Sequence, residues 1–128
     1  MKNLIIKEDN NTPGVILDYD KGIIELSGKS IPDRASNFYE PVMEWINKYI
    51  QNPNSETTFN FKLEYANTGS EKYLLDILRR MESLHKSGKK CKVDWYYEED
   101  DEDIFETGED YKKYLDVPFN LICVPVED

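Results

Sequence analysis

The stretch Tyr65-Ala66-Asn67-Thr68-Gly69-Ser70-Glu71-Lys72 marks the point where a strand pattern changes into a helix pattern. Before it, apolar and polar residues alternate over 57–65, which predicts a half-buried strand. The residues expected on the buried face of this strand are Phe59, Phe61, Leu63 and Tyr65. After it, apolar residues recur at helical spacing, at Leu74, Leu75, Ile77, Leu78, Met81 and Leu84. We therefore expect a strand that leads directly into an amphipathic helix over about 69–86.

Thr68 and Glu71 have the spacing of a capping box, in which each side chain binds the backbone N–H of the other residue. We expect these two residues to cap the helix. The Thr68 hydroxyl then lies at a helix N-terminus, where free N–H groups and the helix dipole favour negative charge. A phosphate could be carried there at little cost to the fold. From local residues alone, the common interpretation of this motif is a cap worth about 1 kcal/mol.

Composition limits the class of protein. A chain of 128 residues fits one domain, residues 1–128. The formal net charge of −10 argues against nucleic acid and anionic membranes as partners, because both attract clustered Lys and Arg. The opening 1–7 turns polar after three apolar residues, and no apolar run approaches the ~20 residues of a membrane span, so we expect a cytoplasmic location. Cys91 and Cys123 lie in apolar, strand-like segments and are expected to be buried thiols.

The remaining segments predict an α/β fold. The strands 15–18 and 23–26 are expected to form a hairpin around Asp20-Lys21-Gly22. A helix is expected near 36–51, with its regular part starting late because Pro41 fits only near a helix start. The other expected features are strands at 4–6, 92–97 and 119–126, a short helix at 109–115, and a C-cap at Gly88.

Alternation of strands and helices after an opening hairpin predicts a mixed β-sheet with about three helices packed on it. The alternating strand 57–65 indicates one open sheet face, as in a two-layer sandwich. In one sheet with a central last strand, this strand would lie toward an edge or have its polar face partly covered. The strand 119–126 is apolar at nearly every position, which predicts a central strand buried on both faces.

Enzyme chemistry has little support in the sequence. His85 is the only histidine, and its place in the last turn of a helix fits a surface residue that complements the dipole. Two cysteines without a C-x-x-C pair do not make a four-ligand zinc site, and no phosphate-binding glycine loop is present. We expect no catalytic residue, no metal ligand and no cofactor.

The acidic run 98–103 lacks the alternating ligand spacing and central glycine of an EF-hand loop. We interpret it as a solvated loop leading into a helix N-terminus, with a docking surface for a basic partner segment as an alternative. A small acidic enzyme or a calcium-binding domain is a further alternative function. Of the preceding aromatic residues 95–97, Tyr96 is the candidate for an exposed interface side chain, because alternate strand residues normally face the core.

Several segments together match one known family. They are Phe38-Tyr39 with Pro41 and Trp45, Asn67-Thr68 with Ser70, Lys72 and 74–78, then 95–97 with the acidic run, Gly108-Glu109-Asp110, and Pro118-Phe119. On these residues the chain resembles the SiaC family of bacterial regulatory phosphoproteins over most of its length. The resemblance implies a fold similar to that of anti-sigma-factor antagonists (STAS-like) and a role in a partner switch.

In such a switch, a serine/threonine kinase phosphorylates the small protein and a metal-dependent phosphatase reverses the modification. The resemblance places the phosphoacceptor at Thr68. Ser70, the nearest hydroxyl two residues into the helix, is the alternative acceptor. The resemblance further implies that the unmodified form binds and activates a diguanylate cyclase, which raises cyclic di-GMP and controls biofilm formation. An anti-sigma factor is the alternative partner. The expected partner-binding residues are Asn67, Thr68, Gly69, Ser70, Lys72 and Tyr96.

Overall fold

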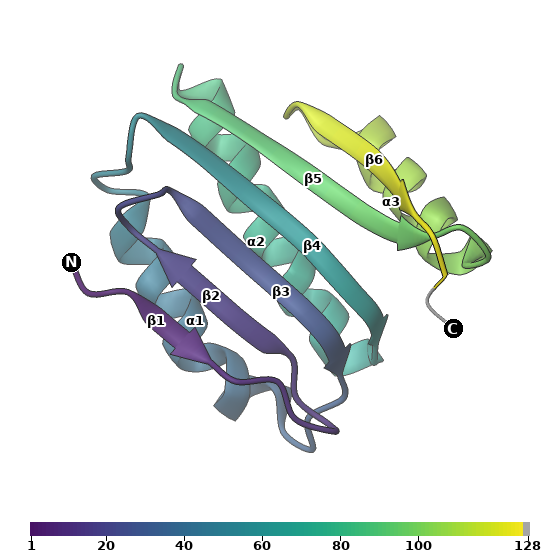
Figure 1. Ribbon diagram of the computed structural model, residues 1–128. Coiled ribbons are helices and arrows are strands. Elements are labelled where there is room, and N and C mark those ends of the chain that lie inside the picture. Colours follow the sequence, from purple (N-terminus) through teal and green to yellow (C-terminus); the bar gives the residue numbers. More distant parts are fainter. Residues whose placement is uncertain (127–128) are drawn as a thin grey trace.

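The computed structural model describes residues 1–126, and within them the chain forms one mixed sheet covered by three helices (Figure 1). The elements are β1 (Leu4–Ile6), β2 (Gly14–Asp18), β3 (Ile23–Ser30), α1 (Ala35–Tyr49), β4 (Glu56–Ala66), α2 (Thr68–Lys86), β5 (Lys90–Glu98), α3 (Glu102–Tyr114) and β6 (Phe119–Val124). The strands follow one another in the sheet in chain order. Strands β1, β2 and β3 pair antiparallel, and β3 to β6 pair parallel. The expected fold class, a mixed sheet with an N-terminal hairpin and about three helices, is confirmed.

The strand order determines where the helices lie. Each connection from β3 onward contains one helix and adds its new strand on the same side of the previous one. Crossovers between parallel strands are right-handed in nearly all proteins, so repeated steps in one direction place every helix on the same face. Figure 1 shows α1, α2 and α3 together behind the sheet. The protein is therefore a two-layer structure, and within residues 1–126 no helix lies on the opposite sheet face.

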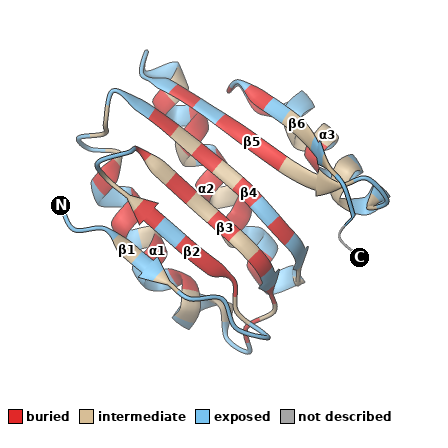
Figure 2. Ribbon diagram, in the orientation of Figure 1, coloured by how far each residue is buried: buried red, intermediate tan, exposed pale blue. Residues whose placement is uncertain are grey.

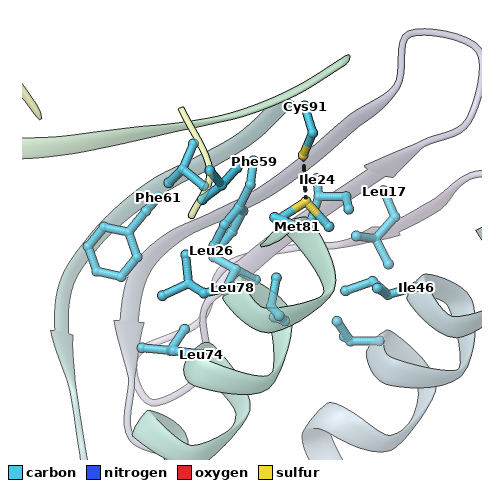
Figure 3. Packing of buried hydrophobic residues seen from close by; sticks show 14 of the residues in the cluster. Leu17, Ile24, Leu26, Ile46, Phe59, Phe61, Leu74, Leu78, Met81 and Cys91 are labelled. Atoms are coloured by element: carbon cyan, nitrogen blue, oxygen red, sulfur yellow. Dashed lines mark hydrogen bonds between the residues drawn. The ribbon is translucent and has the colours of Figure 1, made fainter. Parts of the chain in front are cut away.

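The hydrophobic core lies between these two layers. Buried positions alternate with less buried ones along β3 and β4 (Figure 2). Leu78 and Met81 of α2 point from the helix toward the side chains of Ile24 and Phe59 on the sheet (Figure 3). The largest side chains with almost no exposed surface are Trp95, Tyr39, Tyr49, Phe59, Phe61, Leu17, Ile24, Leu26, Ile46, Ile77, Leu78 and Met81.

The two cysteines differ in environment. Cys91 is buried, its Sγ lies 3.6 Å from the Met81 Sδ, and burial raises the pKa of its thiol to about 12. Cys123 is exposed on β6, so the expectation that both thiols are buried is wrong for this residue.

The predicted central position of the strand 119–126 is wrong, whereas the open sheet face predicted from the strand 57–65 is confirmed. β4 lies in the interior of the sheet, between β3 and β5, and β6 is an edge strand. β4 alternates because helices cover only one face of the sheet, so an interior strand still has a solvated side. In β6, Phe119 is buried while Leu121, Ile122 and Val124 are only half-buried. An apolar run therefore indicated a central strand where the structure has an edge.

Two helices start earlier than predicted. α1 begins at Ala35 and contains Pro41 in its interior. Proline removes the hydrogen bond to the carbonyl of Asn37, and the helix tolerates this because both residues are exposed to water. α3 begins at Glu102 because Asp101 caps it, with the Asp101 Oδ1 accepting a hydrogen bond from the Ile104 N–H at 3.1 Å. The acidic run thus forms the end of β5, a short turn and the first turn of α3.

The end of α2 agrees with the prediction. Gly88 has a φ of +90°, in the left-handed region that favours glycine. Its N–H binds the His85 carbonyl at 3.0 Å, and the Lys89 N–H binds the Leu84 carbonyl at 3.1 Å. This pair of hydrogen bonds is the Schellman motif, which confirms Gly88 as the C-terminal cap residue. Across residues 1–126, no helix has both the length and the apolar composition to cross a membrane.

Candidate functional site at the start of helix α2

The junction between β4 and α2 exposes Thr68 as the first residue of the helix. The N-cap is Asn67, whose Oδ1 accepts a hydrogen bond from the Ser70 N–H at 3.0 Å. The expected capping by Thr68 and Glu71 is therefore wrong by one residue. Asn is among the strongest N-cap residues, and it takes the capping role because its backbone is extended while Thr68 is already helical. Within residues 1–126, the Thr68 hydroxyl has no hydrogen-bond partner.

Ser70 lies two residues further on and is completely buried. Its Oγ donates to the Ser30 carbonyl at 3.1 Å, and the Ser30 Oγ donates to the Ser70 Oγ at 2.8 Å. The Tyr39 hydroxyl lies 2.6 Å from the Ser30 Oγ. Because the single proton of Ser30 is used toward Ser70, Tyr39 must be the donor in this last contact. Burial raises the pKa of Tyr39 and keeps this proton in place.

This hydroxyl chain connects the first turn of α2 to the end of β3 and to α1. The Asn67 N–H adds a backbone hydrogen bond to the Ser30 carbonyl at 2.9 Å. Nearby, the rings of Tyr39 and Tyr73 stack with their centroids 5.0 Å apart. These contacts hold the start of α2 against β3 and α1, and its outer surface faces solvent.

The first turns of α1 and α2 lie close to one another. A Cβ atom on Gly69 would sit 3.4 Å from the Ala35 Cβ, so the two helix N-termini are in van der Waals range at this point. Arg34 and Lys72 are exposed beside them. Both helix dipoles direct their positive ends to this surface, which favours an added negative charge on Thr68.

A β-bulge just before the junction changes which way Tyr65 faces. The pairing of β3 with β4 shifts after Gly28, so that Lys29 pairs with Tyr65 and Glu64 is left as the extra residue. Tyr65 is 55% exposed as a result, although the alternating sequence predicts it on the buried face. Bulges are common next to functional sites because they redirect a side chain.

Tyr65 lies at the rim of a groove between the start of α2 and the start of α3, with a volume of about 530 Å³. We call it the α2–α3 groove. Phe61 and Trp95 stack against each other at its base, with ring centroids 3.5 Å apart. The Trp95 Nε1 donates to the Ile104 carbonyl at 3.0 Å, which holds α3 against the sheet. The lining residues are Phe61, Glu64, Tyr65, Ala66, Glu71, Leu74, Trp95, Asp101, Asp103, Ile104, Thr107 and Tyr111.

Gly108 allows α3 to approach Trp95 this closely. A Cβ atom at this position would lie within 2.6 Å of the Trp95 Nε1 and Cδ1 atoms. Tyr111, on the next turn, packs edge-on to Trp95 with centroids 5.6 Å apart. Burial, and to a lesser degree the negative charge of Glu71, raises the pKa of Tyr111, so its hydroxyl stays protonated at neutral pH.

The structure brings most of the predicted site residues together but separates one of them. Asn67, Thr68, Gly69 and Ser70 are consecutive at the junction, and Lys72 follows on the first turns of the helix. Tyr96 lies instead in β5, half-buried, with the Lys62 Nζ 5.1 Å from its ring centroid. No local sequence pattern predicts the groove, because segments far apart in the chain form it. In the part of the chain that the structure describes, no group of three or more His, Cys, Asp or Glu side chains is arranged to hold a metal ion.

The family model described as SiaC family regulatory phosphoprotein matches residues 6–124. This chain belongs to the SiaC family. The chain is also similar to solved structures over nearly its full length. One of them is the crystal structure of the diguanylate cyclase SiaD in complex with its activator SiaC, both from Pseudomonas aeruginosa. That SiaC is 25% identical, with a TM-score of 0.89 over 94% of this chain and 99% of the other.

Two further proteins are similar to this chain over nearly their full length. Apo-SiaC from P. aeruginosa is 25% identical, with a TM-score of 0.87 over 95% of this chain and 99% of that chain. The protein PA14_02130 of P. aeruginosa strain UCBPP-PA14 is 26% identical over 94% of this chain and 96% of its own length. The similarity thus spans nearly the whole chain.

Proposed function

We propose that this protein is a non-enzymatic regulator that, in its unmodified form, binds and activates a diguanylate cyclase in the cytoplasm. A serine/threonine kinase phosphorylates it on Thr68, and a metal-dependent phosphatase removes the phosphate. Membership of the SiaC family and the full-length similarity to the activator of SiaD support the partner class. The observation that carries the switch is the exposed Thr68 hydroxyl at the start of α2, with Asn67 supplying the cap in its place.

Thr68 is a better phosphoacceptor than Ser70 for a physical reason. A kinase must seat the acceptor hydroxyl in its own active site, and the Ser70 hydroxyl is buried and hydrogen-bonded on both sides. Reaching it would require the first turn of α2 to unfold. Phosphorylation of Thr68 leaves the Asn67 cap and the buried hydroxyl chain untouched.

The added phosphate acts on the partner rather than on the fold. It carries about −1.5 to −2 charges and three acceptor oxygens. Two positive helix ends and the exposed Arg34 and Lys72 receive this charge favourably, by about 0.3–1 kcal/mol at an exposed site. A partner that covers the first turn of α2 meets both the bulk of the phosphate and its charge. A clash of this kind costs several kcal/mol, and each ~1.4 kcal/mol lowers affinity tenfold.

The test compares three forms of the protein as activators: wild type, Thr68→Ala, and wild type phosphorylated stoichiometrically on Thr68. Each is used as bait in an extract of the source cells, retained diguanylate cyclases are identified by mass spectrometry, and cyclic di-GMP synthesis is measured with the purified pair. We expect the two unmodified forms to bind and activate, and the phosphorylated form to bind about 100-fold more weakly. Ser83→Ala, which removes an exposed hydroxyl from the same helix, is the matched control.

Two results would contradict the proposal. One is that no cyclase is retained or activated by the unmodified protein. The other is that protein phosphorylated on Thr68 activates the cyclase as well as the unmodified form does.

A further inference from the structure

We propose that the α2–α3 groove receives an arginine side chain of the partner protein, which stacks on the exposed Tyr65 ring and is held by an acidic rim. This inference rests on the proposed function in one respect: the partner is the protein that docks beside Thr68. The chemistry of the groove itself comes from the residues that line it.

The first observation is the charge of the rim. Four carboxylates, from Glu64, Glu71, Asp101 and Asp103, line the groove, and its described lining contains no Lys, Arg or His. These carboxylates come from β4, from α2 and from the segment that starts α3, so they surround the opening from different sides. A cationic group from outside complements such a rim.

The second observation distinguishes an organic cation from a metal ion. Metal binding needs carboxylates that converge to within coordination distance, and no such group occurs among residues 1–126. The rim charges are spread around a space of about 530 Å³, which lies in the range of about 300–1,000 Å³ typical of sites for small organic groups. A large, flat cation fits this arrangement better than a compact ion.

The third observation is the aromatic side of the groove. Tyr65 is 55% exposed at the rim and Tyr111 is half-buried on the α3 side, while the stacked Phe61 and Trp95 rings, with almost no exposed surface, close the groove from below. A guanidinium group stacks on aromatic faces and binds carboxylates through its planar set of donors, whereas an ammonium group is compact and strongly hydrated. An aromatic face beside several carboxylates therefore favours an arginine side chain over a lysine side chain.

The groove is also continuous with the surface around Thr68. Glu71 lies one helical turn after Thr68 on α2, and Tyr65 and Ala66 precede the junction directly. A partner that covers the first turn of α2 therefore reaches the groove without crossing other structure. Its arginine contact and its contact at Thr68 are separate, so the two can be weakened independently.

The experiment titrates the full chain, labelled with ¹⁵N, with N-acetyl-arginine amide and follows the amide and indole resonances by NMR. We expect saturable shifts at the Trp95 indole N–H and at residues around Ile104 and Glu71, with a dissociation constant of order 1 mM for so small a ligand. The Trp45 indole, which binds the Lys2 carbonyl at 2.7 Å on another part of the molecule, is the internal reference. N-acetyl-citrulline amide, the neutral isostere, should produce little shift, and the lysine amide should bind more weakly than the arginine amide.

Paired variants separate rim charge from net charge. Glu71→Gln with Asp103→Asn removes two rim carboxylates and should weaken arginine amide binding about fivefold. Asp100→Asn with Glu106→Gln removes two charges from the same region outside the groove lining and should leave it unchanged. Equal binding of citrulline amide, shifts outside the groove, or equal effects of the two pairs would overturn the proposal.

The two proposals can fail separately. If a cyclase is retained but its affinity is the same for the rim variant and the control variant, the groove proposal is wrong and the proposed function stands. If arginine amide binds in the groove but no cyclase is retained or activated, the proposed function is wrong and the groove stands.

Discussion

At the scale of single residues, Ser70 has the most connected side chain of the junction. Its hydroxyl is buried, donates to the Ser30 carbonyl and accepts from the Ser30 Oγ. The hydroxyl therefore stabilises the packing of α2 against β3 from the interior, while Thr68 remains available on the surface.

Ser70→Ala should lower the free energy of unfolding by about 1–3 kcal/mol, because it leaves the buried Ser30 hydroxyl without its acceptor. Urea denaturation measures this loss. Ser83→Ala, at an exposed position of the same helix, should change it by less than about 0.5 kcal/mol. Kinase treatment of Ser70→Ala should still give full modification of Thr68. An unchanged stability of Ser70→Ala would show that the buried hydroxyl chain does not hold the junction.

The two thiols give a second prediction at this scale. At pH 8, a thiol with a pKa of about 12 is ionised to only about one part in ten thousand, and Cys91 is also buried. With a chromogenic disulfide reagent, the native protein should show one fast-reacting thiol, Cys123, and a second only after denaturation. In Cys123→Ser the fast phase should disappear. Two fast thiols in the native protein would contradict the burial of Cys91.

At the scale of elements, Glu82 connects α2 to the segment before β6. Its Oε2 accepts a hydrogen bond from the Asp116 N–H at 2.7 Å, and its Oε1 lies 3.5 Å from the Arg79 Nη1. The backbone hydrogen bond from Asp116 is the main cause that lowers the pKa of Glu82, with smaller contributions from the charges of Lys86 and Arg79. The carboxylate form thus stabilises the contact between these elements.

The stability that Glu82 contributes should depend on pH. Because its pKa is lower in the folded state, the contribution is complete above the unfolded pKa of about 4.3 and is lost as the pH falls through the lower folded value. Urea midpoints measured between about pH 6 and pH 3 should fall less steeply for Glu82→Gln than for wild type. Glu44→Gln, at an exposed position of α1, should keep the wild-type slope. Identical slopes for all three proteins would exclude this role.

The elements differ in how far sequence predicts them, for identifiable reasons. The hairpin and α2 follow from periodicity and turn residues, which act locally. The start of α3 was missed because the acidic run 98–103 resembles a loop, although Ile104, Gly108 and Tyr111 already have helical spacing. Ser70 lies four residues before Leu74, on the buried stripe of α2, and this spacing would have indicated its burial. The outward turn of Tyr65 depends on a bulge in the pairing of two strands, which no local pattern contains.

At the scale of the whole molecule, the phosphate adds to an already acidic protein. Modification of Thr68 takes the formal net charge from −10 to about −12. The fold should tolerate this, because the new charge lies at two positive helix ends rather than in the core.

Thermal unfolding of stoichiometrically phosphorylated protein should remain cooperative, with a midpoint within about 4 °C of the unmodified protein and an unchanged far-UV circular dichroism spectrum. Thr68→Ala, treated with the kinase in parallel, is the control for other modified sites. A broad transition or a loss of helical signal after phosphorylation would mean that the switch acts by unfolding α2 instead of by displacing a partner.

The sequence of strands and helices along the chain predicts the type of sheet. It does not predict the position of each strand in the sheet, because that position depends on strand pairing. The helix–strand succession predicted the mixed sheet, whereas the interior place of β4 and the edge place of β6 depend on which strands pair. The α2–α3 groove exists only once β4 and β5 lie side by side.

The consecutive order of the strands has a consequence for synthesis on the ribosome. Every strand pairs with the one made just before it, so no partner has to wait for a segment that emerges much later. The nascent chain can extend its sheet one β-α unit at a time from the N-terminal hairpin. Thr68 can then reach its surface position as soon as α2 docks on β3 and α1, before α3 has left the ribosome.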